Sequence, residues 1–446
     1  MDFSVALNYL FSLGHETLAM KLGLSNTELL LAALDNPQQN YPAAQIAGTN
    51  GKGSTAVMLD SICRAAGLRT GLYTSPHLRS ITERIKIDGQ QISETTFARL
   101  ATTVRSSATE LLDSGSMAAL PTFFEHVTAI SLLAFAEGGV DLAILETGLG
   151  GRLDATTVAG ATTVGITPIA LDHQEYLGDS LAEIAAEKAA IIRPGVSAVV
   201  APQPPEAYAV VLQRCRQCDV IPALADYETA VSAVNDDGRL QVTVQTNQAR
   251  YEGMTLGLRG RHQIVNAATA IGLAESLSDR GFQIPKRAII TGLENARHAG
   301  RLELFAGHPS LLFDGAHNPA GAEALADYLD EFVTGPVTLI FGAMRDKDLK
   351  SILAPLLPRI DQLVLTQPDN PRAANSTELR GLVSGLFDPN ATSMAPSAAA
   401  ALHRALELTP AEGMICVTGS LYLIGELQAV ISDGRELPFA KWHSAH

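Results

Sequence analysis

Short apolar runs alternate with longer helical stretches along most of the chain, which is the pattern of a parallel α/β fold. In the first part of the chain, apolar and β-branched runs predict strands at Gln45–Ala47, Thr70–Tyr73, Asp141–Leu145, Thr163–Ile166 and Ala198–Val200. The remaining stretches predict helices at Thr55–Ala66, Glu125–Ala136, Leu181–Ile191 and Pro205–Cys218. We therefore expect a mostly parallel sheet in this part of the protein.

The pattern changes between Tyr227 and Leu258, where apolar and polar residues alternate. The alternating run Leu240–Val244 follows an Asp236-Asp237-Gly238 turn. This combination predicts a small antiparallel excursion that decorates the sheet.

A second α/β series begins after Arg301. Strands are predicted near Leu311–Phe313, Thr338–Phe341, Gln362–Leu365 and Met414–Val417, and helices near Gly321–Glu331, Leu349–Leu357, Thr377–Leu386 and Ala398–Leu408. The segment Asn295–Arg301 separates the two series, so we predict two domains, residues 1–297 and 298–446. The first is expected to hold a P-loop-type, mostly parallel sheet, and the second to be a smaller, Rossmann-like α/β domain.

Composition and charge narrow the class of protein. The 446 residues, of which 46% are hydrophobic, are enough for two or three domains with full-sized cores. The longest apolar runs, such as Ala189–Ile192 and Val196–Ala201, are too short for a membrane span, and Asp2 stands where a signal peptide would carry positive charge. The net charge of −15, without a basic run, argues against nucleic acid or an anionic membrane as a partner. We expect a cytoplasmic protein.

The four cysteines are too few for a disulfide framework in a chain of this length. Cys215 and Cys218 form one C-x-x-C inside a predicted helix. Because no second pair or histidine lies nearby in the sequence, a zinc or redox role is the less favoured interpretation.

The stretch that points most directly to chemistry is Ala47-Gly48-Thr49-Asn50-Gly51-Lys52-Gly53-Ser54-Thr55. It places glycines, one lysine and the hydroxyl groups of Ser54 and Thr55 between an apolar strand and an apolar helix, which is the arrangement of a phosphate-binding loop with a magnesium ligand. It departs from the common pattern G-x-x-x-x-G-K-[ST] at two positions. Ile46 stands where the pattern has its first glycine, and Gly53 stands where it has serine or threonine. The alternative is an ordinary glycine turn.

Three further residues invite a metal or catalytic interpretation. Glu146 ends an apolar strand, so it is either a solvated acid or a magnesium ligand opposite the phosphate loop, and that loop favours the ligand. His173 follows the strand Thr163–Ile166 and is equally well explained as a metal ligand or a helix-capping loop residue. Lys188 lies in a small-residue helix, where a snorkelling lysine is the simpler explanation.

Taken together, the motifs resemble the folylpolyglutamate synthase/dihydrofolate synthase family of the Mur ligase superfamily, over nearly the whole chain. The segments that carry the resemblance occur in the family's order: Gly48–Thr55, Tyr73–Leu78, Glu146–Ala155, Asp172–Gly178, Glu187–Ala189, Gly260–Ala268, Gly300-Arg301, Phe313–Pro319, Phe341–Asp348 and Gly419–Tyr422. Such enzymes use ATP to join an amino acid to a carboxylate through an acyl phosphate. The resemblance implies addition of L-glutamate to dihydropteroate, to the γ-carboxylate of reduced folates, or to both, by a monomer.

The resemblance also implies roles for individual residues in binding ATP and Mg²⁺. The phosphates of ATP are expected at Thr49, Asn50, Gly51, Lys52, Gly53 and Ser54, with Asn266 near the base and Arg301, Asp314 and His317 near the rest of the nucleotide. Magnesium is expected at Ser75, Glu146 and His173. Lys188 matches a lysine that is carbamylated in the family, and this replaces the snorkelling interpretation.

Pterin contacts are implied at Thr122, Phe123, Phe124 and Glu125, and at Leu153, Asp154 and Ala155. Two positions depart from the family pattern: Thr157 stands where asparagine is common, and His126 follows Phe124-Glu125. Both bear on substrate preference and leave the ATP chemistry unchanged. The carboxylates of glutamate need positive or N–H partners, for which the helix start after Asn318-Pro319, Arg301 and the Ser420 segment are candidates.

Two other functions are alternatives to this one. A Mur-type peptidoglycan ligase would share the phosphate loop, Glu146, His173 and Lys188, but would be expected to carry a further domain for a UDP-sugar ahead of the loop. A P-loop switch or motor protein would hydrolyse nucleotide without forming an amide, and would not explain these three residues.

Overall fold

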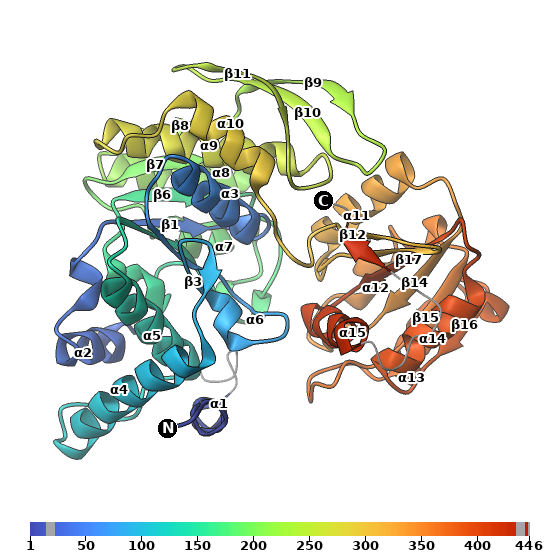
Figure 1. Ribbon diagram of the computed structural model, residues 1–446, viewed down its shortest axis with the longest axis horizontal. Helices are drawn as coiled ribbons and strands as arrows, with labels where there is room; N and C mark the ends of the chain where they lie inside the picture. Colours follow the sequence, from blue (N-terminus) through green and yellow to red (C-terminus); the bar gives the residue numbers. More distant parts are fainter. Residues whose placement is uncertain (15–22, 434–441, 445–446) are drawn as a thin grey trace.

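Two α/β units, each with its own sheet and core, make up the computed structural model, which describes residues 1–14, 23–433 and 442–444. In Figure 1 the N-terminal domain runs from blue to yellow and the C-terminal domain from orange to red. The two-domain α/β architecture expected from the sequence is confirmed.

The sheet of the N-terminal domain has eight strands in the order β4-β3-β2-β5-β1-β6-β7-β8. Its strands are β1 (Ala43–Ala47), β2 (Thr70–Tyr73), β3 (Ile85–Ile87), β4 (Gln90–Gln91), β5 (Leu142–Glu146), β6 (Thr163–Ile166), β7 (Ser197–Val200) and β8 (Ala223–Leu224). All neighbouring strands pair in parallel except β2 with β3 and β3 with β4, at one edge. The strand order changes direction at β1, so ligands are expected beyond its carboxyl end.

Helices cover both faces of this sheet, which explains why its central strands read as continuous apolar runs. One face carries α3 (Lys52–Ala65), α9 (Gln263–Asp279) and α10 (Lys286–Asn295). The other side carries α1 (Phe3–Ser12), α2 (Ser25–Ala33), α4 (Glu94–Asp113), α5 (Phe123–Gly138), α7 (Leu181–Ala189) and α8 (Pro205–Gln217). The short α6 (Gln174–Leu177) and the 3₁₀ turns η1 (Pro37–Gln39), η2 (Ile81–Arg84) and η3 (Ala155–Ala159) lie in connections.

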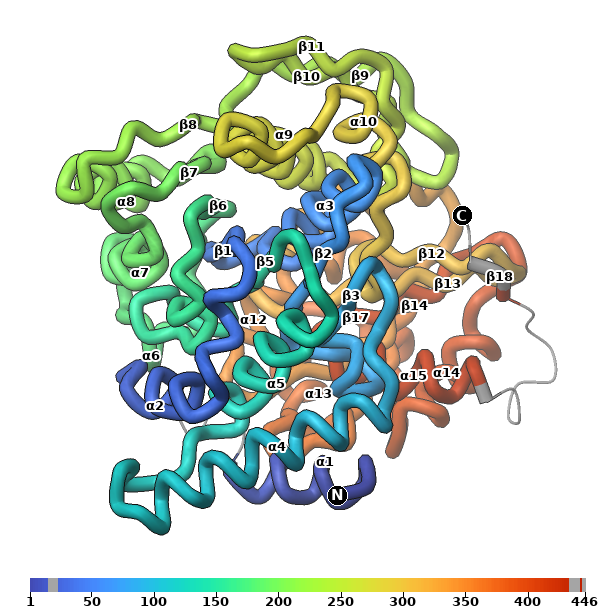
Figure 2. Tube along the Cα trace, turned by 60° about the vertical axis from the view of Figure 1, so that its left-hand side comes forward, coloured from blue at the N-terminus to red at the C-terminus, as the bar shows by residue number. Residues whose placement is uncertain are grey.

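The antiparallel excursion is confirmed, but it forms a separate sheet of β9 (Glu228–Val234), β10 (Leu240–Gln245) and β11 (Arg250–Thr255). Its buried face packs on the helices of the α3 side, outside the main sheet, as Figure 2 shows at the top of the molecule. The buried Glu275 of α9 accepts hydrogen bonds from Thr246 and Tyr251 and ties the small sheet to that helix. The excursion therefore adds a layer to the domain and does not extend the main sheet.

The C-terminal domain is built on a seven-stranded sheet with the order β16-β15-β14-β17-β13-β12-β18. Its strands are β12 (Glu303–Ala306), β13 (Ser310–Phe313), β14 (Val337–Phe341), β15 (Gln362–Leu365), β16 (Thr392–Met394), β17 (Met414–Thr418) and β18 (His443–Ser444). Its helices are α11 (Pro319–Phe332), α12 (Leu349–Leu353) and α13 (Ser376–Val383) on one face and α14 (Ala398–Leu408) and α15 (Leu421–Asp433) on the other, with turns η4 (Leu357–Arg359) and η5 (Pro389–Ala391).

The strands and helices predicted for both series match elements of the structure to within a few residues at most ends. Within the described ranges, no helix is both long and apolar enough to cross a membrane.

Candidate active site

The phosphate loop, residues 47–55, connects the end of β1 to the start of α3 at the carboxyl edge of the sheet. Gly51 has φ of 85°, and a Cβ at this position would overlap the Asn266 side chain. Glycine is therefore required both for the turn and for the close approach of α9. The first amide groups of α3 lack acceptors within the helix, so the loop fits an anion such as a phosphate group.

Lys52, the first residue of α3, folds back over this loop. Its Nζ donates to the main-chain oxygens of Gly48 and Thr49, at 3.1 Å each. Burial lowers the pKa of Lys52, while the charges of Glu146 and Asp172 oppose that shift. An anion in the loop would supply the counter-charge that carbonyl dipoles supply only in part.

The residues expected at magnesium come from three strand ends. Glu146 ends β5, and its Oε2 accepts a hydrogen bond of 3.0 Å from the main-chain N–H of Ser75, which follows β2. Burial raises the pKa of Glu146, and the charge of Lys52 counteracts it. His173 precedes α6 with φ of 52°, and burial lowers its pKa to about 4, so the ring is neutral near pH 7.

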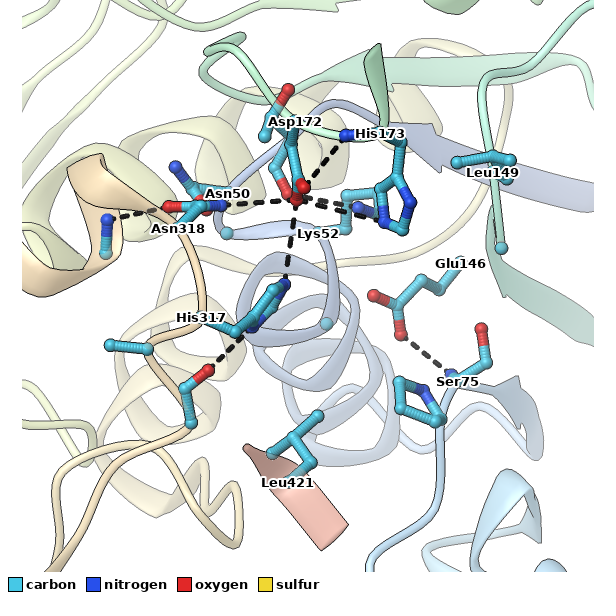
Figure 3. A pocket seen from close by; sticks show the side chains of 18 of the residues that line it. Asn50, Lys52, Ser75, Glu146, Leu149, Asp172, His173, His317, Asn318 and Leu421 are labelled. Carbon is cyan, nitrogen blue, oxygen red and sulfur yellow. Dashed lines mark hydrogen bonds and ion pairs between the residues drawn. The ribbon is translucent and has the colours of Figure 1, made fainter. Parts of the chain in front are cut away.

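No group of three or more His, Cys, Asp and Glu side chains in the described ranges is arranged as a metal site. The predicted set contains only two such residues, Glu146 and His173, and Ser75 would add a hydroxyl oxygen. Figure 3 shows these residues on one side of the pocket. An oxygen-rich, incomplete set of this kind fits Mg²⁺, which keeps several waters, better than a metal held entirely by protein.

Lys188 reaches the same loop from α7. Its side chain is buried, and its Nζ donates to the Gly48 carbonyl oxygen at 2.7 Å. Burial, assisted by the charge of Lys52, lowers the pKa of Lys188 to about 7. A large fraction of the amine is therefore neutral at physiological pH.

Asp172 is the centre of a cluster that joins the two domains, as Figure 3 shows. Its carboxylate accepts hydrogen bonds from Lys347 Nζ at 2.6 Å and Asn318 Nδ2 at 3.3 Å. The rings of His317 and His173 lie 3.7 and 3.8 Å away. Burial alone would raise the pKa of Asp172, but His317, His173 and Lys347 hold it well below its usual range.

Sequence reasoning had not given roles to Asp172, Asn318 or Lys347, although all three lie inside motifs that it had quoted. Asn318 also donates to the Asn50 side chain at 2.9 Å, so a C-terminal-domain residue contacts the phosphate loop directly. Asp172 and Asn318 each stand next to a predicted site residue, His173 and His317, and this was the available signal. Lys347 has no such neighbour in the sequence.

The residues predicted near the rest of the nucleotide lie around the same cavity. Asn266 donates to Gln263 at 2.8 Å on α9. Asp314 follows β13 and accepts hydrogen bonds from the main-chain N–H groups of Leu302 and Ala316, and burial raises its pKa. Arg301 and His317 line the cavity with them.

Five of the seven residues predicted for the pterin line the cavity, and two do not. Phe124, Glu125, Leu153, Asp154 and Ala155 line it. Thr122 instead caps α5 with Glu125, and the buried Phe123 stacks on Phe11. These two residues shape the start of α5 and so act on the cavity through their neighbours.

The two positions that depart from the family pattern also lie behind the cavity wall. Thr157 accepts from Gln45 at 2.9 Å and donates to the Gly151 carbonyl oxygen at 2.8 Å. His126 is fully buried between Tyr9 and the Thr122 carbonyl oxygen. Neither lines the cavity, so their effect on substrates would be indirect.

The cavity itself has a volume of about 550 Å³ and is lined by both domains. The N-terminal domain contributes the phosphate loop, Glu146 and Lys188, and the C-terminal domain contributes Arg301 and Lys347. The arrangement places the glycine-rich loop of one domain opposite cationic groups of the other.

Comparison with known proteins places this site in a class. The Mur ligase middle domain matches residues 46–274, and the Mur ligase glutamate ligase domain matches residues 300–421. The first match ends and the second begins on either side of the predicted boundary at 297/298, which remains a prediction.

Relatives with known names define the family more closely. The dihydrofolate synthase/folylpolyglutamate synthase of Mycobacterium tuberculosis is 38% identical over 391 residues, which cover 82% of this chain and 78% of that protein. A probable bifunctional folylpolyglutamate synthase/dihydropteroate synthase of Haloferax volcanii is 34% identical over 96% of this chain. This chain spans about half the length of that relative, 50%.

Solved structures agree with this placement. The M. tuberculosis folylpolyglutamate synthase complexed with ADP matches with a TM-score of 0.89 and 33% identity, over 96% of this chain and 99% of that one. A bifunctional folylpolyglutamate synthase/dihydrofolate synthase with Mn, AMPPNP and L-glutamate bound matches with a TM-score of 0.83 and 29% identity, over 97% and 98%. The chain belongs to the folylpolyglutamate synthase/dihydrofolate synthase family of the Mur ligases.

Proposed function

We propose that this protein is an ATP-dependent ligase that adds L-glutamate to dihydropteroate, to the γ-carboxylate of reduced folates, or to both. The observation that carries the proposal is the single cavity in which the phosphate loop of one domain faces Arg301 and Lys347 of the other. Relatives that cover most of this chain are named for this activity, so the peptidoglycan-ligase and switch-protein alternatives are not favoured.

The chemistry explains why such a cavity is needed. A carboxylate is a poor acyl donor, so its oxygen must first take the γ-phosphoryl group of ATP, which gives an acyl phosphate and ADP. The neutral amino group of glutamate then attacks the acyl carbon, inorganic phosphate leaves with the bonding electron pair, and the amine gives up a proton. Lys52 and the amide groups of α3 neutralise and align the phosphates, which is most of what phosphoryl transfer requires of a protein.

We propose Ser75, Glu146 and His173 as the residues that would hold Mg²⁺. A bound Mg²⁺ would supply charge neutralisation at the phosphate oxygens. Glu146 is already oriented by the Ser75 amide, and the neutral His173 ring has a lone pair available to a metal.

Lys188 is proposed to carry a carbamate. Its neutral amine would attack the carbon of CO₂, forming an N–C bond and releasing one proton to solvent. The product is a buried carboxylate beside Lys52, which would replace a destabilising pair of like charges by an attractive one. The low pKa of Lys188 supports this proposal because only the neutral amine reacts.

The cavity walls suggest where the two organic substrates bind. The apolar Phe124, Leu153 and Ala155 offer contact to a flat pterin ring on the side of α5. We place the carboxylates of glutamate near Arg301, the start of α11 after Asn318, and Ser420, with Lys347 as a further cation.

Incubation of the purified protein with ATP, Mg²⁺ and labelled glutamate tests the proposal, with dihydropteroate and tetrahydrofolate offered separately and the products identified by mass. We expect one labelled glutamate to be added per ADP formed with at least one acceptor. ADP formation without a labelled amide would reject the ligase in favour of a nucleotide switch.

We infer a monomer in the cytoplasm that acts on these small molecules without nucleic acid or membrane. Sedimentation of the purified protein and fractionation of cells test these two points directly.

A further inference from the structure

A loop of the N-terminal domain packs into the core of the C-terminal domain. Leu78, in the connection between β2 and η2, is half-buried and packs against the apolar cluster that contains Leu423, Ile424 and Leu427 of α15. Ser75 and Pro76, which line the cavity, precede Leu78 by only three and two residues, so this contact lies close to the proposed metal site.

The main chain of α15 is shaped to receive this loop. A Cβ at Gly425, in the middle of the helix, would overlap the carbonyl oxygen of Leu78. Arg79 extends the contact along the helix, since its Nη1 lies 3.0 Å from Ser432 Oγ. A glycine in a helix interior costs stability, so close backbone approach is a physical reason for its presence here.

Side chains of Glu83 and Arg84 hold the loop residues 77–80 in place. The Glu83 carboxylate accepts hydrogen bonds from the main-chain N–H groups of Leu78, Arg79 and Ser80, at 2.8, 3.0 and 2.8 Å. The Arg84 Nε donates to His77 Nδ1 at 2.8 Å. These bonds hold residues 77–80 as one unit, and Pro76 alone separates that unit from Ser75 along the chain.

The same loop orients a proposed metal ligand at its other end, where the Ser75 N–H donates to Glu146 Oε2. The helix α15 likewise reaches the cavity, because Ser420 and Leu421 at its start line it, and Figure 3 shows Leu421 facing the side of Ser75. The loop that contains Leu78 and the helix α15 thus link the domain interface to the proposed metal site.

We propose that Leu78, seated on Gly425, is a positioning contact that couples docking of the C-terminal domain to the placement of Ser75 against Glu146. This inference rests on the proposed function, because it assigns the contact a part in aligning the phosphates for transfer. The coupling is reciprocal, so a metal–nucleotide complex bound at Ser75 and Glu146 also favours the docked arrangement of the domains.

Two substitutions test the contact from its two sides, Leu78→Ala and Gly425→Ala. We expect kcat to fall by on the order of tenfold to a hundredfold, as a misplacement of about 1 Å does in other enzymes. The Mg²⁺ concentration for half-maximal activity should rise severalfold, because the proposed metal ligands lie at the end of this loop. The KM for ATP at saturating Mg²⁺ should rise less, because the phosphate loop itself is untouched. Leu78→Met, which keeps the side-chain volume, should retain most of the kcat and the Mg²⁺ dependence of the unmodified protein.

Matched controls lie in the C-terminal domain, away from this contact. Gly381→Ala places the same methyl group in helix α13, where a Cβ meets open space, and Leu386→Ala removes a leucine that is 54% exposed. Neither should change kcat or the Mg²⁺ dependence. If Leu78→Ala and Gly425→Ala lower only the melting temperature and leave both kinetic quantities within about twofold, the contact is merely structural and the proposal is wrong.

A readout without turnover separates this inference from the proposed function. X-ray scattering in solution with AMPPNP and Mg²⁺ should give a larger radius of gyration for Gly425→Ala than for the unmodified protein and Gly381→Ala. Equal radii for all three would overturn the coupling. Absence of any amide product from the unmodified protein would instead overturn the proposed function and leave the scattering comparison to decide the inference.

Discussion

At the residue scale, burial and like charge control the two lysines beside the phosphate loop. Lys52 and Lys188 both donate to the carbonyl oxygen of Gly48, at 3.1 and 2.7 Å. Two buried ammonium groups on one carbonyl oxygen repel each other, and the low pKa of Lys188 is partly due to this. The pair is stabilised when negative charge enters, either as phosphate on Lys52 or as a carbamate on Lys188.

Lys52→Ala tests the phosphate half of this argument. We expect kcat to fall by on the order of a hundredfold to a thousandfold, because a charged group that faces the transferred phosphate is lost. Stability should not fall, since a buried cation is removed. Product formation and a thermal melt measure the two effects, with the exposed Lys350→Ala as control. A variant that keeps a large part of its activity would remove Lys52 from the phosphate site.

Lys188→Ala tests the carbamate half. Activity should be lost and then partly rescued by formate or acetate, which can place a carboxylate in the space that is vacated. In the unmodified protein, activity should decline as the pH falls through about 7, because the amine becomes protonated and cannot hold the carbamate. Carbon-13 NMR with labelled bicarbonate should show a carbamate signal that Lys188→Ala lacks, and its absence from the unmodified protein would contradict the modification.

At the scale of elements, the strands that are buried on both faces were the ones best predicted from the sequence. Central strands such as β5 and β17 are buried on both faces and read as unbroken apolar runs. Helix α9 was not predicted, because it is buried on nearly all sides and its small and apolar residues show no 3.6-residue period. The short strands β3, β4 and β12, which pair in antiparallel fashion near the sheet edges, were also missed, since pairing with a neighbour defines them more than composition does.

For the candidate site, too, the sequence predicted only what local patterns can show. Residues next to a strand end or a glycine turn, such as Glu146 and Lys52, were found from local sequence. The Asp172–Lys347 contact was not, because it joins residues 175 positions apart in two domains. Local pattern carries no information about such a contact.

The packing of α1 on α5 gives a prediction about pH and stability. His126 of α5 is fully buried against Tyr9 of α1, and burial lowers its pKa to about 4. The unfolded chain takes up this proton near pH 6.5, so the folded state loses stability as pH falls from about 6.5 to 4. The loss at the low end is about 3 kcal/mol from this one residue.

Urea unfolding at a series of pH values measures this effect. His126→Gln, which cannot titrate, should lose less stability between pH 7 and pH 4.5 than the unmodified protein does. Tyr9→Phe removes the hydrogen bond but keeps the histidine, so its pH dependence should remain. Equal pH slopes for all three proteins would mean that His126 does not control acid stability.

At the scale of the whole molecule, two ion pairs join the domains at the same N–O distance but in different surroundings. Lys347 lies 2.6 Å from Asp172, with side chains 12% and 8% exposed. Arg261 lies 2.6 Å from Glu331, with side chains 52% and 31% exposed. Because solvent screens the second pair, only the first should contribute strongly to holding the domains in the arrangement that the cavity requires.

Double-mutant cycles on kcat/KM distinguish the two pairs. We expect a coupling free energy of about 2 kcal/mol between Lys347→Ala and Asp172→Asn, because each single change leaves a buried polar partner uncompensated. Arg261→Ala and Glu331→Gln should couple by less than about 1 kcal/mol, and raising the salt concentration should erase that coupling first. Couplings of equal size, or equal sensitivity to salt, would show that burial of the Asp172 cluster does not govern domain docking, because the exposed pair would then contribute as much as the buried one.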